Sequence, residues 1–163
     1  MNKYSEITYL QNKLFWNDWK TAADGEYKGY TFAIMYNGVN PCAYVMLPKT
    51  HKFYDSICRL IDIAEKYGIG EVMRNNEYNI INTVCRCHGD ITWFGSIQNN
   101  IEGAWFGWDY MHYPMDYNGY LQSGYKKWTV AEIYEDVKNV IDNLVIFNKN
   151  RKKLNFSIDE VGN

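Results

Sequence analysis

A capped amphipathic helix near the C-terminus is the feature that most constrains the fold of this 163-residue chain. Residues 129–132 read Thr-Val-Ala-Glu, a capping box in which Thr129 and Glu132 satisfy free backbone N–H groups at the start of a helix. Charged residues occupy one side of the helix that follows, which we expect over residues 129–149, so its other side must pack against the rest of the chain. That apolar face consists of Val130, Ile133, Tyr134, Val137, Ile141, Leu144 and Val145.

Short segments rich in strand-forming residues supply a surface for that helix to cover. Residues 27–36 and 42–47 predict two strands joined by a tight turn at Asn37-Gly38. Residues 54–67 carry an apolar stripe at helical spacing and predict an inserted helix. Three further strands are predicted at residues 78–87, 91–95 and 104–109. The sequence therefore predicts an α+β domain with an antiparallel sheet of about five strands and helices packed on one face.

The remaining segments complete a single domain, residues 1–163. Residues 1–25 are assigned to an N-terminal helix, because apolar positions within residues 5–21 recur at helical spacing. Residues 27–109 form the sheet with its one inserted helix, and residues 113–127 form a long loop. Residues 150–163 form a tail. Neither an internal repeat nor a Pro/Gly-rich linker divides the chain.

The charge balance argues against one broad class of partner. Seventeen Lys and Arg residues oppose 19 Asp and Glu residues, giving a net charge of −2. Such a chain has no global positive field to hold a polyanion, so general nucleic-acid binding is not expected. The N-terminal sequence MNKYSEITYL lacks an apolar signal-peptide core, and no run of about 18 apolar residues indicates a membrane helix. We therefore expect a cytoplasmic protein with reduced cysteines and no membrane partner.

The stretch from His88 to Asp116 concentrates the residues that can carry chemistry. Its aromatic runs are bordered by His-Gly-Asp and by Trp-Asp-Tyr-Met-His, which places ionisable groups at the edge of an apolar wall. His88, Asp109 and His112 could bind a divalent metal or act as general acid and base. They could equally hold a nucleotide through hydrogen bonds, or simply cap turns. The candidate ligand-binding residues are His88, Asp90, Trp93, Trp105, Trp108, Asp109, His112 and Tyr113.

The aromatic side chains of this stretch favour recognition. If residues 104–109 form a strand, Trp105 and Asp109 share one face, while Phe106 and Trp108 share the other. A tryptophan that points away from the core is costly unless something covers it. A stacked base would contribute about 1–3 kcal/mol there, and a protein partner could use the same rings as anchors.

Other motifs for catalysis and cofactors are weak. Cys85 and Cys87 would face the same side of a strand, but a second ligand pair for zinc is missing. Gly68-Ile-Gly70 lacks the Lys-Ser/Thr ending of a phosphate loop, and Gly-x-Ser-x-Gly is absent. We therefore expect buried structural thiols, with neither a bound metal nor a cofactor.

Three segments of the chain resemble a known family. Residues 47–51 read Leu-Pro-Lys-Thr-His, residues 88–93 read His-Gly-Asp-Ile-Thr-Trp, and residues 105–112 read Trp-Phe-Gly-Trp-Asp-Tyr-Met-His. From about residue 27 to 147, this order resembles a family of small, mostly uncharacterised proteins of bacteriophages and other mobile elements. That family carries a His-Gly-Gly-x-Thr-Tyr motif and a Gly-Phe-Asp-Cys-Ala-His motif.

The chain departs from this pattern in both motifs. Asp90 stands where the family has Gly, Trp108 replaces Phe, and Tyr110-Met111 replace Cys-Ala. The two histidines and the aspartate of the motifs are kept. The resemblance implies a phage accessory protein, one that counters bacterial immunity.

We therefore weigh three hypotheses. The favoured one is a phage counter-defence protein that binds in the cytoplasm of the infected bacterium. Its partner is either a small signalling nucleotide, sequestered in an aromatic pocket, or a host immune effector such as a CRISPR nuclease. The alternative is a small hydrolase, with or without a metal, that uses His88, Asp109 and His112. The third is an interaction or structural phage protein whose motifs serve the fold. The C-terminal helix and outward aromatics would permit a homo-oligomer.

Overall fold

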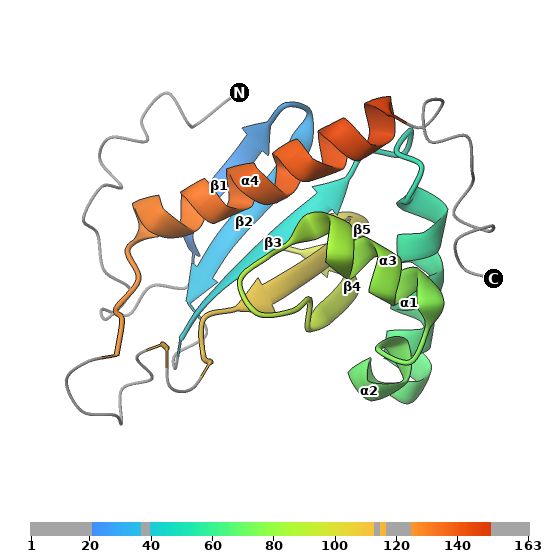
Figure 1. The fold of residues 1–163 in the computed structure, drawn as a ribbon, viewed down its shortest axis with the longest axis horizontal. Coiled ribbons are helices and arrows are strands. Elements are labelled where there is room, and N and C mark those ends of the chain that lie inside the picture. Colours follow the sequence, from blue (N-terminus) through green and yellow to red (C-terminus); the bar gives the residue numbers. More distant parts are fainter. Residues whose placement is uncertain (1–20, 37–39, 113–114, 117–124, 151–163) are drawn as a thin grey trace.

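The computed structural model describes residues 21–36, 40–112, 115–116 and 125–150, which form an α+β fold (Figure 1). The fold class predicted from the sequence is confirmed, because a five-stranded antiparallel sheet packs with helices around one core. The elements in chain order are β1 (Thr21–Tyr27), β2 (Tyr30–Tyr36), β3 (Pro41–Leu47), α1 (Tyr54–Tyr67), α2 (Ile69–Val72), α3 (Asn76–Cys85), β4 (Trp93–Gln98), β5 (Ile101–Asp109) and α4 (Val130–Lys149).

The strands lie in the order β1-β2-β3-β5-β4, and every neighbouring pair is antiparallel. Lys28 and Gly29 join β1 to β2 with φ angles of 50° and 87°, and Asn99 and Asn100 join β4 to β5 with φ angles of 54° and 62°. Two consecutive residues with positive φ make a hairpin turn whose twist matches that of the strands. β5 follows β4 in the chain but lies inside the sheet, paired with β3.

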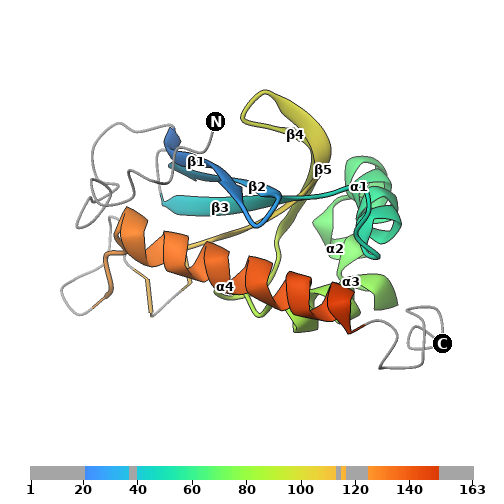
Figure 2. The ribbon, with the colours of Figure 1, turned by 90° about the horizontal axis from the view of Figure 1, so that it is seen from above.

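One face of the sheet is covered by α4, which runs across β1, β2 and β3 (Figure 2). Phe32, Val45 and Phe106 lie in register on three neighbouring strands, and all three are fully buried. Ile133 and Val137 on α4 are equally buried. Each such side chain contributes about 1.5–3 kcal/mol when it leaves water, so the amphipathic pattern accounts for how α4 is held.

The start of α4 has the capping box expected from the sequence. Thr129 Oγ1 accepts a hydrogen bond from the backbone N–H of Glu132 at 3.1 Å, and Glu132 Oε1 accepts one from the N–H of Thr129 at 3.0 Å. Two backbone donors that the helix itself cannot pair are thereby satisfied. The predicted helix is confirmed over Val130–Lys149.

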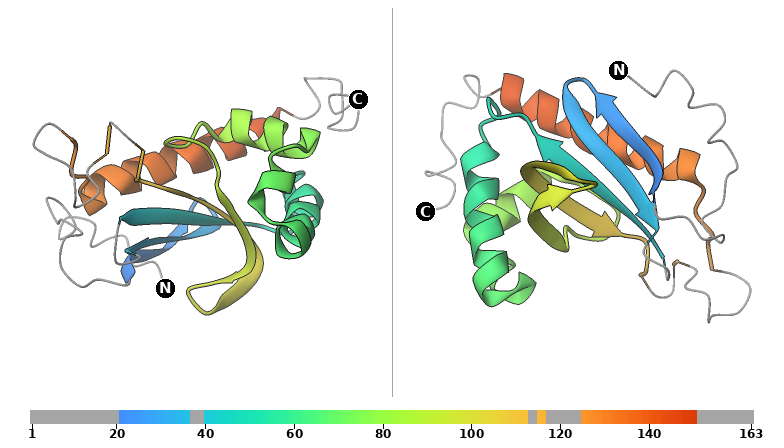
Figure 3. Two further views of the ribbon diagram at one scale, coloured as in Figure 1. Left: turned by 90° about the horizontal axis from the view of Figure 1, so that it is seen from below. Right: turned by 180° about the vertical axis from the view of Figure 1, so that it is seen from behind.

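The other helices lie beside the β4–β5 end of the sheet (Figure 3). α1 packs against β4 and β5, and α3 packs against α4 and α1. Asn143 on α4 donates through Nδ2 to the carbonyl oxygen of Cys85 at the end of α3, at 3.0 Å. Their buried side chains join those of the sheet in the same core. Within the described part of the chain, no helix is both long and apolar enough to cross a membrane.

The prediction of a strand at residues 78–87 is wrong, because most of this segment belongs to α3. Asn75 caps the helix by accepting the N–H of Glu77 at 2.8 Å, and Tyr78, Ile81 and Cys85 form a buried face at helical spacing. β-branched residues gave the segment the composition of a strand, but the cap and the packing against α4 decide for a helix. Three helices, not one, therefore separate β3 from β4.

The N-terminal boundary also differs from the prediction. Residues 21–25, assigned to a helix, form the first part of β1. Ala22 and Ala23 are buried there, so pairing with β2 overrides the weak local strand preference. The segment predicted as one strand over 27–36 contains the β1–β2 turn. The rest of the predicted N-terminal helix, the Asn37-Gly38 turn, most of the 113–127 loop and nearly all of the tail lie outside the described residues.

Candidate functional site

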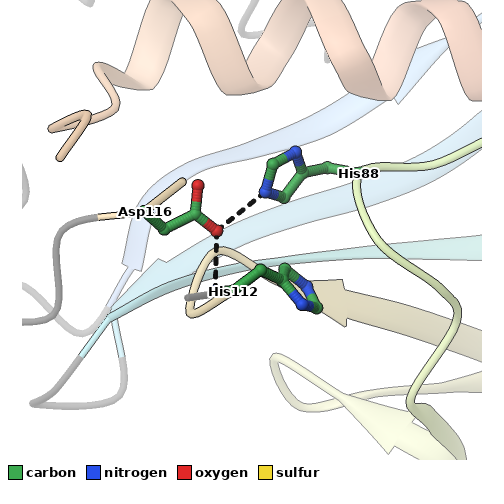
Figure 4. A group of neighbouring side chains, drawn as sticks. All are labelled: His88, His112 and Asp116. Carbon is green, nitrogen blue, oxygen red and sulfur yellow. Dashed lines mark hydrogen bonds and ion pairs between the residues drawn. The ribbon is translucent and has the colours of Figure 1, made fainter. Parts of the chain in front are cut away.

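His88, His112 and Asp116, which we call the histidine–aspartate cluster, come together at one end of the sheet (Figure 4). His88 follows the end of α3, and His112 and Asp116 follow the end of β5. His88 Nε2 lies 2.7 Å from Asp116 Oδ2. The side chain of Asp116 is fully buried, whereas those of His88 and His112 are 13% and 26% exposed. The structure thus brings the two histidines together and places Asp116, not Asp109, against His88.

The buried carboxylate of Asp116 is satisfied from three directions. Oδ2 accepts the His88 ring and also the backbone N–H of His112 at 2.9 Å, and Oδ1 accepts the indole N–H of Trp128 at 2.8 Å. A buried carboxylate without such donors would be strongly destabilising. Because an ionised carboxylate only accepts, the hydrogen on the His88 ring lies on Nε2. The hydrogen bonds of the cluster therefore connect three parts of the chain: the residues after α3, the residues after β5 and Trp128, just before α4.

His112 lies directly over a glycine. A Cβ atom on Gly89 would lie 2.3 Å from Nε2 of His112, and Gly89 has a φ of 64°. The same ring nitrogen lies 3.0 Å from the carbonyl oxygen of Asp109, so it carries the hydrogen and donates it. The His-Gly pair of the sequence motif thus has a steric reason, because a side chain at position 89 would displace the second histidine.

An aromatic box surrounds His88. Its ring stacks on Tyr110 with centroids 4.6 Å apart and planes 7° apart, and Trp128 lies edge-on at 4.9 Å. The hydroxyl of Tyr110 accepts the indole N–H of Trp108 at 3.1 Å and donates to Asp136 at 2.7 Å. Burial raises the pKa of Tyr110 well above its usual value and also raises the pKa of Asp136. In this buried place, the loss of water penalises the charged form of each group.

Trp128 and Asp136 are functional neighbours that the sequence analysis missed. Trp128 lies beyond a long loop, and its indole reaches Asp116 only through tertiary folding. Asp136 lies on α4 and is 2.7 Å from the Tyr110 hydroxyl. Its one signal in the sequence is its position beside Ile133 and Val137 on the apolar face, where an acidic residue needs a partner.

Asp109 belongs to the edge of the site rather than to its buried centre. Its Oδ2 accepts the hydroxyl of Thr92 at 3.2 Å, and its Oδ1 accepts the N–H of Met111 at 3.0 Å. His112 Nε2 lies 3.5 Å from Oδ1 of Asp109. The predicted Asp109–His112 pair is thus present, with Asp109 31% exposed. Its carboxylate holds the chain at the end of β5.

The tryptophans predicted to stack on a ligand are buried. Trp105 and Trp108 point to opposite faces of β5, as predicted, but only 0% and 1% of their surfaces are exposed. Trp105 donates its indole N–H to the carbonyl of Ile101 at 2.9 Å. Neither ring offers a face to a ligand in this conformation. The alternating pattern alone predicts one covered and one open face of β5, whereas both faces are covered over Ala104–Trp108.

The last three candidate positions have different environments. The ring of Trp93 is half-buried, lies close against Gly95 on its own strand, and meets Tyr44 edge-on at 5.0 Å. Asp90 is exposed and accepts the side-chain N–H of Asn82 at 2.9 Å, which shapes the turn after His88. Tyr113 lies outside the described residues.

The cysteines are poor nucleophiles. Burial raises the pKa of Cys42 to about 11 and of Cys87 to about 12, and raises that of Cys85 well above its usual value. A thiol is reactive only as the thiolate, so these groups stay inert near neutral pH. The buried structural role predicted for Cys42, Cys85 and Cys87 is confirmed; Cys58 is half-buried.

The third histidine, His51, serves the fold far from the cluster. It is 4% exposed, its Nδ1 accepts the N–H of Phe53 at 2.9 Å, and its Nε2 lies 3.1 Å from the carbonyl oxygen of Leu144. The Pro-Lys-Thr-His turn thereby joins the start of α1 to α4. Burial lowers the pKa of His51, so the ring stays neutral.

Comparison with known proteins gives no relative. No protein-family model, curated protein sequence or solved structure matches this chain.

Proposed function

We propose that this chain is a phage counter-defence protein that acts in the cytoplasm of the infected bacterium by binding a host immune effector protein. The supporting observation is the pair of methionines beside the cluster. Met111 and Met115 are 49% and 57% exposed, and they flank His112 in the segment from Asp109 to Asp116. Exposed methionines are frequent at protein-binding surfaces, because their flexible, polarisable side chains adapt to a partner.

The cluster and Asp109 support this role by fixing the two ends of that segment. The carboxylate of Asp116 is held through His88 and Trp128, and Asp109 is held through Thr92. A segment whose ends are already held loses less conformational entropy when a partner docks. The polar groups of the cluster would then serve recognition by positioning the segment.

The burial of Trp105 and Trp108 favours a protein over a nucleotide as the partner. Sequestration of a nucleotide in an aromatic pocket needs an open ring face, and these two rings present none. The near-neutral net charge is also compatible with a protein partner. The resemblance to phage proteins stays a prediction, and it supplies the choice of an immune effector as the target.

A panel of bacterial hosts, each carrying one defence system, tests the proposal. The wild-type chain should restore phage plaques against at least one system. Replacing Met111 and Met115 by Asp should abolish that rescue, because two anchors worth about 1–2 kcal/mol each account for more than about thirtyfold in affinity. The matched control is Tyr67→Asp on α1, where the side chain is 71% exposed. The proposal fails if the wild type rescues no phage, or if the double variant rescues as well as the wild type.

One observation favours the hydrolase as a second candidate. The 2.7 Å contact between His88 and the buried Asp116 orients an imidazole as in enzymes that use a histidine as general base. In that case His88 and His112 would carry turnover, with Asp109 at the rim. His112→Ala would then abolish turnover of a nucleotide substrate and leave its binding intact. Recovery of only unaltered nucleotide after incubation with the wild type would exclude the hydrolase.

A further inference from the structure

We infer that the histidine–aspartate cluster is a binding site for one divalent transition metal ion, such as Zn²⁺, Co²⁺ or Fe²⁺. His88, His112 and Asp116 each offer one ligand atom, and these atoms all lie within 4.8 Å of one another. With metal–ligand bonds of about 2.0–2.2 Å, neighbouring ligand atoms approach to about 3 Å, so a small side-chain adjustment closes the site. This inference goes beyond the proposed function and does not rest on it.

The donor set selects the class of metal. Two imidazole nitrogens and one carboxylate oxygen form the combination that holds ferrous iron and related transition metals on one face and leaves open positions on the other. Harder ions such as Mg²⁺ and Ca²⁺ prefer sites built mainly from oxygen. The described residues put two nitrogens and one carboxylate here, which favours the transition metals.

The surroundings of the ligands match those of known metal sites. His112 donates Nε2–H to the carbonyl oxygen of Asp109, which leaves its Nδ1 with a lone pair. Metal-bound histidines almost always donate their other ring N–H to such an oxygen. Trp128 donates to Asp116 Oδ1 at 2.8 Å and so orients the carboxylate from behind. His88 Nε2 already faces that carboxylate, and binding through it needs only a shift of the ring hydrogen to Nδ1.

The backbone brings the ligands together. The N–H of Asp116 donates to the carbonyl oxygen of His112 at 2.9 Å, and this single turn places both side chains beside His88. Gly89 allows the close approach of the His112 ring. Both features are local and independent of any ligand, so the site is largely formed before an ion arrives.

Cobalt absorption and metal analysis of the full chain provide the test. The chain is stripped with a chelator and titrated separately with Co²⁺ and Zn²⁺. We expect one ion per chain, visible absorption bands from bound Co²⁺, and a higher melting temperature with either ion. His112→Ala should weaken binding by at least about tenfold, since it removes one ligand. Asp116→Asn should do the same if circular dichroism shows that it folds.

Asp142→Asn is the matched control, because it changes a partly exposed carboxylate on α4 that pairs with Lys28, and it leaves the three ligands intact. It should bind both ions as tightly as the wild type. The inference is overturned if the wild-type chain binds neither ion at one per chain, or if His112→Ala binds both as the wild type does. Neither result depends on an immune partner, so failure of this inference is distinguishable from failure of the proposed function.

Discussion

Protonation of His51 should set a step in the acid stability of the protein. The ring accepts from Phe53 through Nδ1 and donates to Leu144 through Nε2, so both nitrogens are satisfied in the neutral form. A second proton on Nδ1 would face the N–H of Phe53 in a site that is 4% exposed. Burial lowers the pKa of His51 in the folded chain, whereas the unfolded chain titrates near pH 6.5. The contribution of neutral His51 to the free energy of unfolding is therefore present above about pH 6.5 and is lost as the pH falls below that value.

The size of this loss follows from proton linkage. Between about pH 7.5 and about pH 5.5, the unfolded state takes up most of one proton at this position, and the folded state takes up less because burial lowers the pKa of His51. The free energy of unfolding should therefore fall through His51, by at most about 1.4 kcal/mol, the limit in which the folded ring takes up no proton over this range. Urea unfolding at the two pH values measures the fall. In His51→Asn, the amide oxygen can still accept the N–H of Phe53 but does not titrate over this range.

Between the two pH values, the free energy of unfolding of the variant should therefore fall by less than that of the wild type, with a difference of at most about 1.4 kcal/mol. It should also be about 1–3 kcal/mol less stable at neutral pH, because Leu144 loses a donor and the smaller side chain leaves space. His88 and His112 are present in both proteins, so their contributions cancel in the comparison. Equal pH dependence in the two proteins would refute the reasoning, because His51 would then take up its proton without cost in the fold.

Two further predictions concern local geometry, and urea unfolding measures both. Thr129→Ala removes the capping box of α4 and should cost about 1 kcal/mol; an unchanged midpoint would show that tertiary packing alone holds the helix end. Gly89→Ala should cost more than about 1 kcal/mol, because its Cβ would meet His112 at 2.3 Å and its φ is 64°. Gly70→Ala is the matched control, since a Cβ there meets no atom within 4 Å and the residue lies in α2. Equal stabilities of the two glycine variants would contradict the packing described for the cluster.

The parts of the fold that the sequence predicts well are those set by neighbouring residues. The capping box at Thr129 and the apolar face of α4 need only a helical period, and the opposite faces of Trp105 and Trp108 need only the alternation of a strand. α3 fails this test. Its strand-like composition is overruled by the Asn75 cap and by contacts with α4 that no local pattern records.

The candidate site divides in the same way. His88 and His112 can be picked out of the sequence because they border aromatic runs, and the structure brings them together. The partners that fix them cannot be picked out in this way. Asp116 lies in the same stretch, but its role depends on Trp128, which is 12 residues further along the chain. Burial of both β5 tryptophans depends on what packs against each face of the sheet, and the alternation of the strand alone does not specify that packing.

The position of β5 inside the sheet bears on how the chain reaches its native state. β1, β2 and β3 pair with neighbours in sequence and need only short loops to close. The pairing of Leu47 on β3 with Ala104 on β5 must wait until the three intervening helices are accommodated. Closing such a loop costs entropy before contacts repay it, and pairings distant in sequence slow folding. We therefore expect the β3–β5 seam to form late, with the hairpin of β4 and β5 docking as a unit onto a preformed meander.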